Sequence, residues 1–199
     1  ITQIDQEFKK INIGFEIDKG EKMYIGQINI AGNTKTRDKV ARRELPLKEG
    51  ELFNSMLTNF SKDRLERTGY FQNVKITPRR RMGDKGILDL EVDVEEKPTG
   101  NITFGGGFSS SSNILGNIGI EQHNLFGTGL KAKAGGHLGG YYRRINLGVT
   151  QPYFMDLPIS AGTNLFSHSI EYPSLDARKL GNEVNLGKHL FEYVRGNVG

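Results

Sequence analysis

Residues 87–108 read ILDLEVDVEEKPTGNITFGGGF, and the character of the chain changes in the middle of this stretch. Before Pro98, leucine and valine alternate with aspartate and glutamate, which is the period-two pattern of a strand with one buried and one solvated face. After Pro98 the alternation continues, but glycine and uncharged polar residues take the place of the acids. The two sides of Pro98 therefore predict strands in two different environments.

The composition of the whole chain divides at the same point. Residues 1–99 contain 36 charged residues and 8 glycines, whereas residues 100–199 contain 14 charged residues and 18 glycines. The first part is typical of a soluble domain, and the second needs another explanation. The formal net charge is only +4 and no basic tail is present, so nucleic acid is not an expected partner.

Several classes of chemistry are excluded by what the sequence lacks. Cysteine is absent, which excludes disulfide scaffolds and thiol catalysis. The histidines are scattered without metal-ligand spacing, and no serine sits in a nucleophile motif. No run of 18 apolar residues predicts a transmembrane helix, but a membrane-spanning strand needs only about 9–11 residues. We expect no enzyme, no cofactor and no metal.

The first half predicts a strand–helix–helix–strand–strand module. Strands are expected at residues 23–30, 74–81 and 88–95. A first helix is expected to begin at a Thr36 N-cap and a second at an Asn54 N-cap. The apolar face and the end of the second helix are predicted at Met56, Leu57, Phe60, Leu65 and Gly69.

A shorter pattern precedes this module. Residues 11–18 alternate as a half-buried strand and are expected to form a hairpin with residues 2–8. A hairpin alone is marginally stable. We therefore interpret residues 1–19 as the end of a preceding domain.

The last two strands of the module predict their own register. Symmetric pairing about the turn at residues 82–86 places Lys75 opposite Asp93 and Arg79 opposite Asp89. Opposite charges across a ladder favour such a register by about 0.2–1 kcal/mol each. The acidic face is therefore expected to be a neutralised solvent face and not a carboxylate active site.

Pro78 places its strand at the edge of the sheet, because proline cannot donate to a ladder on both sides. An open edge can accept an extended client segment by strand addition. Alternatively the edge is merely tolerated and is blunted by Pro78 and the neighbouring arginines. The residues alone leave both interpretations open.

The second half predicts a series of antiparallel strands. They are expected near residues 101–108, 117–121, 130–138, 143–153 and 183–187, with a weakly alternating one at 158–169. Six strands cannot close a transmembrane barrel, since about eight are the smallest known, so the polypeptide is expected to continue past residue 199. The alternative is a soluble all-β adhesion or binding domain with both faces sealed by protein.

Four short motifs resemble a known family. Gly32-Asn33 after the first strand and the RTGYF segment at 67–71 resemble a POTRA domain. The NLFGTG segment at 124–129 and the QPYF segment at 151–154 resemble two turns of the BamA family of outer-membrane assembly factors. Because all four occur in the family's order, the chain is identified as similar to that family.

The resemblance implies a fold and a location. The fold would be an α+β POTRA module (β-α-α-β-β) followed by antiparallel strands of an incomplete transmembrane β-barrel. Residues 1–19 would end a preceding POTRA domain, residues 20–97 would form the last POTRA domain, and residues 98–199 would form the first five or six barrel strands. The barrel would lie in the bacterial outer membrane and the POTRA part in the periplasm.

The resemblance also implies a function, the non-enzymatic assembly and insertion of β-barrel proteins. Its partners would be unfolded outer-membrane proteins, accessory outer-membrane lipoproteins and the lipid bilayer. Clients would add as strands to the edge formed by Asn73, Val74, Lys75, Ile76 and Thr77. The first barrel strand would form a lateral seam from Asn101, Ile102, Thr103, Phe104, Gly105, Gly106, Gly107 and Phe108. The glycines in this strand either weaken the seam or admit a bend or a close neighbour.

One further role and one further function follow from the resemblance. Arg42, Arg43 and Glu44 match a segment whose acidic residue docks an accessory lipoprotein, although a surface glutamate is commonly only solvated. The alternative function is a polypeptide-translocating pore of the two-partner secretion or TamA type, which uses the same modules.

Overall fold

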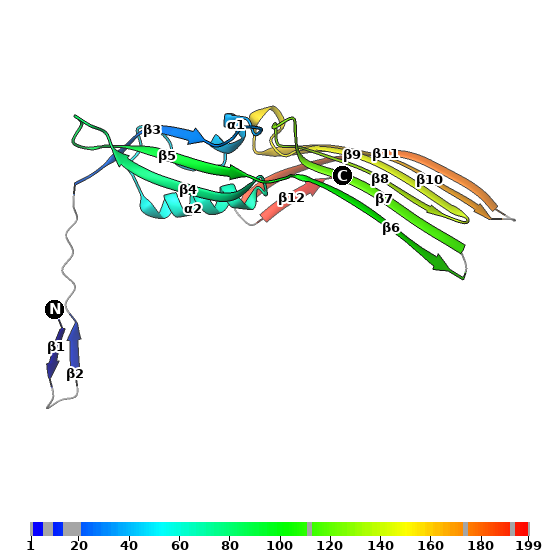
Figure 1. Ribbon diagram of the computed structural model, residues 1–199, viewed down its shortest axis with the longest axis horizontal. Helices are drawn as coiled ribbons and strands as arrows, with labels where there is room; N and C mark the ends of the chain where they lie inside the picture. Colours follow the sequence, from blue (N-terminus) through cyan, green and yellow to red (C-terminus); the bar gives the residue numbers. More distant parts are fainter. Residues whose placement is uncertain are drawn as a thin grey trace.

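The computed structural model describes residues 2–5, 10–13, 21–110, 113–172, 175–191 and 194–198. Within them the strands form a two-stranded, a three-stranded and a seven-stranded sheet. The three-stranded sheet with its helices and the seven-stranded sheet follow one another along the long axis (Figure 1). The expected fold class, an α+β module followed by antiparallel strands, is confirmed.

The short hairpin at the start of the chain is present. β1 (Thr2–Asp5) pairs antiparallel with β2 (Lys10–Ile13). Of the strand predicted at residues 11–18, residues 14–18 lie outside the described part of the chain.

The module has the predicted order of elements. They are β3 (Tyr24–Ala31), α1 (Asp38–Arg42), α2 (Ser55–Arg67), β4 (Phe71–Arg80) and β5 (Ile87–Glu96). The strand order is β3-β5-β4, with β3 parallel and β4 antiparallel to the central β5. β4 is therefore an outer strand, as its proline predicts.

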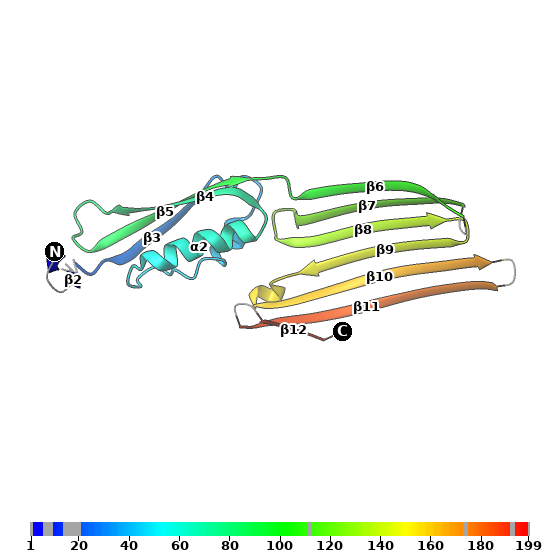
Figure 2. The same cartoon turned by 90° about the horizontal axis from the view of Figure 1, so that it is seen from below.

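The module is held together by a core between its sheet and its helices. The leucines and valines of β5, for example Leu90 and Val92, are at most 8% exposed, and so are Leu65 of α2 and Phe71 of β4. Figure 2 shows α2 lying across one face of this sheet. Full burial of one such side chain stabilises the fold by about 1.5–3 kcal/mol. The alternation in β5 is thus a water-soluble pattern with one face covered.

Helix α2 begins and ends where the sequence predicts. The Asn54 side chain accepts a hydrogen bond from the Met56 N–H at 2.9 Å, and Gly69 has a φ of +77° just after the helix. The predicted apolar face is partly wrong, because Met56 is 77% exposed while Ser61 is fully buried. The Ser61 hydroxyl donates to the carbonyl of Leu57 at 2.6 Å, which allows a polar side chain at this position.

The predicted N-cap of the first helix is wrong. The N-cap position of α1 is Arg37, and its side chain makes no capping hydrogen bond. Thr36 is 2% exposed, and it bonds instead to groups that are distant in sequence. A buried threonine with long-range partners does not need the local capping role.

The register of β4 and β5 is the predicted one, with Lys75 opposite Asp93 and Arg79 opposite Asp89. The ion pairs are only partly those expected. Arg79 pairs diagonally with Glu91, with Nε 2.7 Å from Oε2. Glu91 and Asp89 are thus paired with arginines of the neighbouring strand and turn, but not with the residues directly opposite them.

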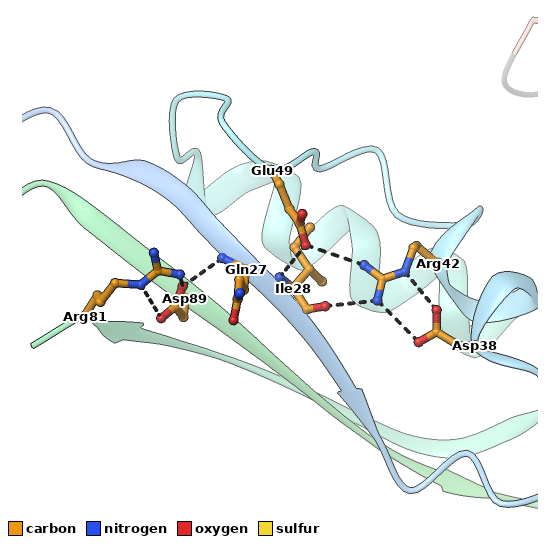
Figure 3. Close-up of polar contacts among 7 residues, drawn as sticks. All are labelled: Gln27, Ile28, Asp38, Arg42, Glu49, Arg81 and Asp89. Atoms are coloured by element: carbon orange, nitrogen blue, oxygen red, sulfur yellow. Dashed lines mark hydrogen bonds and ion pairs between the residues drawn. The ribbon is translucent and has the colours of Figure 1, made fainter. Parts of the chain in front are cut away.

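Asp89 has a second use at the β3–β5 contact (Figure 3). Its carboxylate accepts hydrogen bonds from the Arg81 guanidinium, both at 3.0 Å or less, and from the Gln27 N–H at 2.7 Å. These bonds lower the pKa of Asp89, that to Arg81 most. Gln27 lies where the β3 register shifts, between Ile25 and Ile28. Asp89 therefore satisfies an N–H that the irregular ladder leaves without a strand partner.

The second half forms one antiparallel sheet in consecutive order, with β6 and β12 outermost. Its elements are β6 (Gly100–Ser109), β7 (Asn113–Leu125), β8 (Leu130–Gly139), β9 (Tyr142–Gln151), the 3-10 turn η1 (Phe154–Asp156), β10 (Ile159–Tyr172), β11 (Leu175–Phe191) and β12 (Val194–Val198). The sequence predicts five or six strands here, and the described residues form seven.

The two faces of this sheet differ in chemistry. One face carries an apolar row in which Phe104 opposes Ile118, and these side chains are 86% and 59% exposed. The other carries polar side chains such as His137, which opposes Arg144. The sheet is a single layer, and no described helix covers either face (Figure 2). The described residues thus lack the second layer that a soluble sandwich would need.

No helix within the described part of the chain is both long and apolar enough to cross a membrane.

Candidate functional site: two strand edges and the junction between them

The predicted client edge lies on the outer strand of the module. Residues 73–77 pair with β5 on one side only, and no described strand pairs with the other side. Val74 points into the core and is 1% exposed, whereas Asn73 and Lys75 are exposed. The edge therefore combines a firmly anchored strand with an open row of backbone groups, which is what strand addition requires.

The predicted seam strand is also an outer strand. Among the described strands β6 pairs with β7 alone, and residues 100–108 are all exposed. A Cβ at Gly105 would meet the Asn117 side chain, whereas one at Gly107 would have nothing within 4 Å. Gly105 thus has a close side-chain neighbour, whereas Gly107 has none. Gly107 leaves the outer strand with little side-chain packing at that point.

The predicted docking segment at residues 42–44 divides between two environments. Arg42 is on the exposed face of α1, where Nε is 2.8 Å from Asp38, and its guanidinium also donates to the carbonyl of Ile28 at 3.1 Å (Figure 3). Although it makes these bonds, the Arg42 side chain is 43% exposed and so remains accessible.

Glu44 is in the other environment. Its side chain is only 13% exposed and its carboxylate is 3.1 Å from the Arg64 guanidinium. Burial, and then the charge of Glu44 and a hydrogen bond to it, raise the pKa of Tyr153 in the turn after β9. Glu44 is thus largely buried and paired with Arg64, so it is not a free surface carboxylate.

The structure brings together residues that sequence reasoning did not connect. The loop between β3 and α1 (residues 33–37, the docking loop) and the turn between β7 and β8 (residues 126–129, the β7–β8 turn) are in direct contact. The turn after β9 contacts α1, where Arg43 lies 4.1 Å above the Tyr153 ring. The sequence did contain a signal for these contacts. The β7–β8 turn belongs to the NLFGTG motif, and the turn after β9 follows from the QPYF motif. We call these contacts the module–sheet junction.

Nothing in the described residues offers a metal centre, because no group of three or more His, Asp or Glu side chains is placed to hold an ion. The candidate site consists instead of strand edges and a packed junction.

Comparison with known families gives two matches that together cover most of the chain. The POTRA model, described as "Surface antigen variable number repeat", matches residues 23–105. The model of the Omp85 superfamily domain matches residues 124–199. The two matches fall on the module with the start of β6 and on the later strands of the large sheet, respectively.

Individual relatives agree with the family models. The chain is 31% identical over 202 residues to the outer membrane protein assembly factor BamA of Buchnera aphidicola, covering 99% of this chain and 33% of that protein. It is 32% identical to BamA of Neisseria meningitidis, covering 97% of this chain and 25% of that protein. The chain thus spans about a third or less of these curated relatives.

Solved structures show the same relation. The crystal structure of BamA from Haemophilus ducreyi lacking POTRA domains 1-3 superposes with a TM-score of 0.84 at 28% identity, covering 99% of this chain and 38% of that one. CdiB from Acinetobacter baumannii superposes with a TM-score of 0.54 at 17% identity, which shows a shared fold alone.

The fold and the two matched domains define a POTRA module joined to strands of an incomplete outer-membrane β-barrel of the Omp85 superfamily. Within that class, the chain belongs to the BamA family. Members of this family lie in the bacterial outer membrane with their POTRA domains in the periplasm, and this chain shares that location.

Proposed function

We propose that this chain takes part in the non-enzymatic assembly of β-barrel proteins into the outer membrane. Its BamA relatives are named as outer membrane protein assembly factors. Unfolded outer-membrane proteins are the proposed clients. The chain supplies a periplasmic binding module and the first strands of a membrane-embedded sheet, and it needs neither nucleotide nor cofactor.

One observation carries the proposal, namely that a single chain holds outer strands of two different kinds. β4 belongs to the soluble module and β6 to the sheet with an apolar face. We propose that residues 73–77 of β4 receive client segments by strand addition and that residues 101–108 of β6 form the lateral seam where strands enter the membrane. Main-chain hydrogen bonds supply affinity at such edges and do not depend on client sequence.

The test is site-specific photo-crosslinking in the full-length protein. A photoreactive residue at Thr77 of β4 or Thr103 of β6 is expected to capture client strands. Matched probes at Glu91 of β5 and Asn146 of β9 lie on central strands and are expected to capture several times less. Equal capture at outer and central strands, in a protein that still assembles clients, would refute both roles.

The predicted domain division is kept as part of the proposal. Residues 20–97 would act as the last POTRA domain and residues 98–199 as barrel strands, with residues 1–19 ending a preceding POTRA domain. Proteolysis supports this division if cleavage concentrates near residue 20 and leaves residues 23–97 intact.

The alternative, a polypeptide-translocating pore, has less support. The CdiB structures resemble the chain at 17% and 16% identity, whereas BamA relatives reach 28–32% over nearly the whole chain. The fold is common to both groups, so the higher identity favours assembly.

Docking of an accessory lipoprotein is proposed only for the exposed part of the predicted segment. Glu44 would have to leave Arg64 to meet a partner, whereas Arg42 is accessible. Arg42→Glu is therefore expected to reduce co-purification of an accessory lipoprotein, with Lys62→Glu on α2 as the control. Unchanged co-purification would remove Arg42 from the proposed interface.

A further inference from the structure

The docking loop and the β7–β8 turn meet through buried polar contacts. The Asn124 side chain, at the end of β7, donates to the Thr36 hydroxyl at 2.8 Å, and this bond is buried. The Arg37 N–H donates to the carbonyl of Gly127 at 3.0 Å. A Cβ at Gly127 would overlap the carbonyl oxygen of Lys35, so the two backbones touch directly. Buried polar pairs of this kind are costly to separate because each partner would lose its hydrogen bond.

One carboxylate holds the docking loop in the shape that makes these contacts. Glu96 Oε2 accepts hydrogen bonds from the Thr34 hydroxyl at 2.8 Å and the Lys35 N–H at 2.9 Å. Its Oε1 accepts from the Thr36 N–H at 2.6 Å. Hydrogen bonds to an ionised acceptor are about twice as strong as neutral ones. Burial raises the pKa of Glu96, but the bonds from residues 34–36 outweigh it and lower the pKa to about 2.

Glu96 also stands where the module becomes the seam strand. It is the last residue of β5, and β6 begins four residues later at Gly100. The intervening Lys97 donates its N–H to the carbonyl of Tyr70 at 3.0 Å. The Tyr70 hydroxyl donates in turn to the carbonyl of Gly129 in the β7–β8 turn at 3.5 Å. The connection to the seam strand is thus tied to the same turn from a second side.

The turn after β9 makes an independent contact with the same module. Lys39 of α1 pairs with Asp156 at 2.5 Å, and Arg43 lies over Tyr153. Met155 and Asp156 are consecutive non-glycine residues with φ values of 54° and 64°. Such conformations persist only where the surroundings over-determine them, and contact with α1 supplies such a constraint. The junction therefore has two contact points on the sheet, of which Glu96 organises the first.

We propose that Glu96 is a positioning residue whose carboxylate locks the docking loop onto the β7–β8 turn, fixing the orientation of the POTRA module relative to the seam strand β6. The lock brings the client edge of β4 and the outer strand β6 into one defined arrangement. Transfer of clients from the β4 edge to β6 through this arrangement rests on the proposed function, but the existence of the lock does not.

A crosslinking reporter tests the lock in the full-length protein reconstituted in lipid. Lys35→Cys and Phe126→Cys place one thiol on each side of the contact. Both positions are exposed, Phe126 by 80%, and the chain contains no native cysteine. Other cysteines of the full-length protein would be removed, and a short bis-maleimide would join the pair whenever the module is docked. Glu96→Gln is expected to slow crosslinking roughly fivefold, the order of effect expected from losing one net hydrogen bond.

Two further variants keep the test decisive. Glu95→Gln removes an exposed neighbouring carboxylate and is expected to leave the crosslinking rate unchanged. Asn124→Ala removes the hydrogen bond to Thr36 from the sheet side and is expected to slow crosslinking as Glu96→Gln does. Because residue 124 lies outside the module, this variant remains informative if Glu96→Gln perturbs the module itself. Unchanged crosslinking in both Glu96→Gln and Asn124→Ala would overturn the lock.

Client assembly measured on the same proteins separates the two proposals. Slower crosslinking in a protein that never assembles clients would uphold the lock and reject the proposed function. Unchanged crosslinking in a protein that does assemble clients would reject the lock and leave the function standing.

Discussion

The central strand of the module and the first strand of the large sheet share a sequence pattern but not an environment. In β5, Leu90 and Val92 are at most 1% exposed beneath the helices. In β6, Phe104 and Phe108 are 86% and 85% exposed on the same period of two. Alternation alone therefore specifies a two-faced strand, and the presence or absence of a second protein layer decides whether protein or lipid covers the apolar face.

The difference also separates two sources of stability. The module packs its own core and is expected to fold without lipid. The apolar face of the sheet has no protein cover in the described residues, so the bilayer is expected to supply the missing apolar contact. Each prediction below changes one region and uses the other as its control.

The largest expected effect comes from emptying the core of the module. Phe71→Ala should lower the module's free energy of unfolding by about 3–5 kcal/mol, because it leaves a cavity where Phe71 is 1% exposed. Phe104→Ala, at 86% exposed, should leave that free energy unchanged. Urea unfolding followed by pulse proteolysis measures both. Similar losses for the two variants would contradict the separation of the regions.

The next effect concerns the two faces of the large sheet. Leu147→Arg puts a charge on the apolar face and should lower the stability of the membrane-inserted state by about 2–4 kcal/mol. Asn146→Arg, one residue away on the opposite face, should cost much less. The folded fraction in lipid vesicles, followed by heat-modified gel mobility, gives the comparison. A larger cost at residue 146 would reverse the assignment of the faces.

A smaller effect distinguishes the two helices of the module. Asn54→Ala should destabilise the module by about 1 kcal/mol, because the side chain caps α2. Arg37→Ala should change little through capping, since the Arg37 side chain makes no cap to α1. Because the cap is local, its effect should be the same with and without lipid. Thermal unfolding in both conditions checks this independence.

The smallest effect is expected from protonating Glu96 at the junction by lowering the pH. The pKa of Glu96 is lowered from 4.5 to about 2 by bonds from residues 34–36, so its carboxylate stabilises the docking conformation of that loop above pH 4.5. That contribution should be lost as the pH falls from 4.5 towards 2, and nothing should change between pH 8 and 5. Energy transfer between two dyes, attached at neutral pH to the Lys35→Cys and Phe126→Cys pair and then followed against pH, measures it. A midpoint near neutral pH would show that another group controls the docking.

Local signals predicted the ends of α2 and the register of the last hairpin. Asn54 and Gly69 act through adjacent backbone, and the register of Lys75 with Asp93 follows from the position of the turn. Prediction failed at Met56, whose side chain is 77% exposed, and at Thr36, where the outcome depended on distant partners. Thr36 does not cap the helix, because it forms hydrogen bonds with Glu96 and Asn124, which are 60 and 88 residues away in the chain.

The weakly alternating strand at residues 158–169 has a similar explanation. β10 extends from Ile159 to Tyr172, and its Phe166 lies opposite Gly181 of β11 on the polar face. A Cβ at Gly181 would overlap the Phe166 ring. The aromatic ring fills the space above a glycine, so it breaks the polar alternation without breaking the sheet.

The sequence by itself determined the element order, the outer position of β4, the change of environment at Pro98 and the family, because each depends on periodicity, on proline chemistry or on short motifs. Tertiary structure alone decided that Glu44 turns inward to Arg64 and that Glu96 holds the docking loop against the β7–β8 turn. Such contacts join residues far apart in the chain. Their free energy depends on burial and geometry, and those exist only after the two regions have packed together.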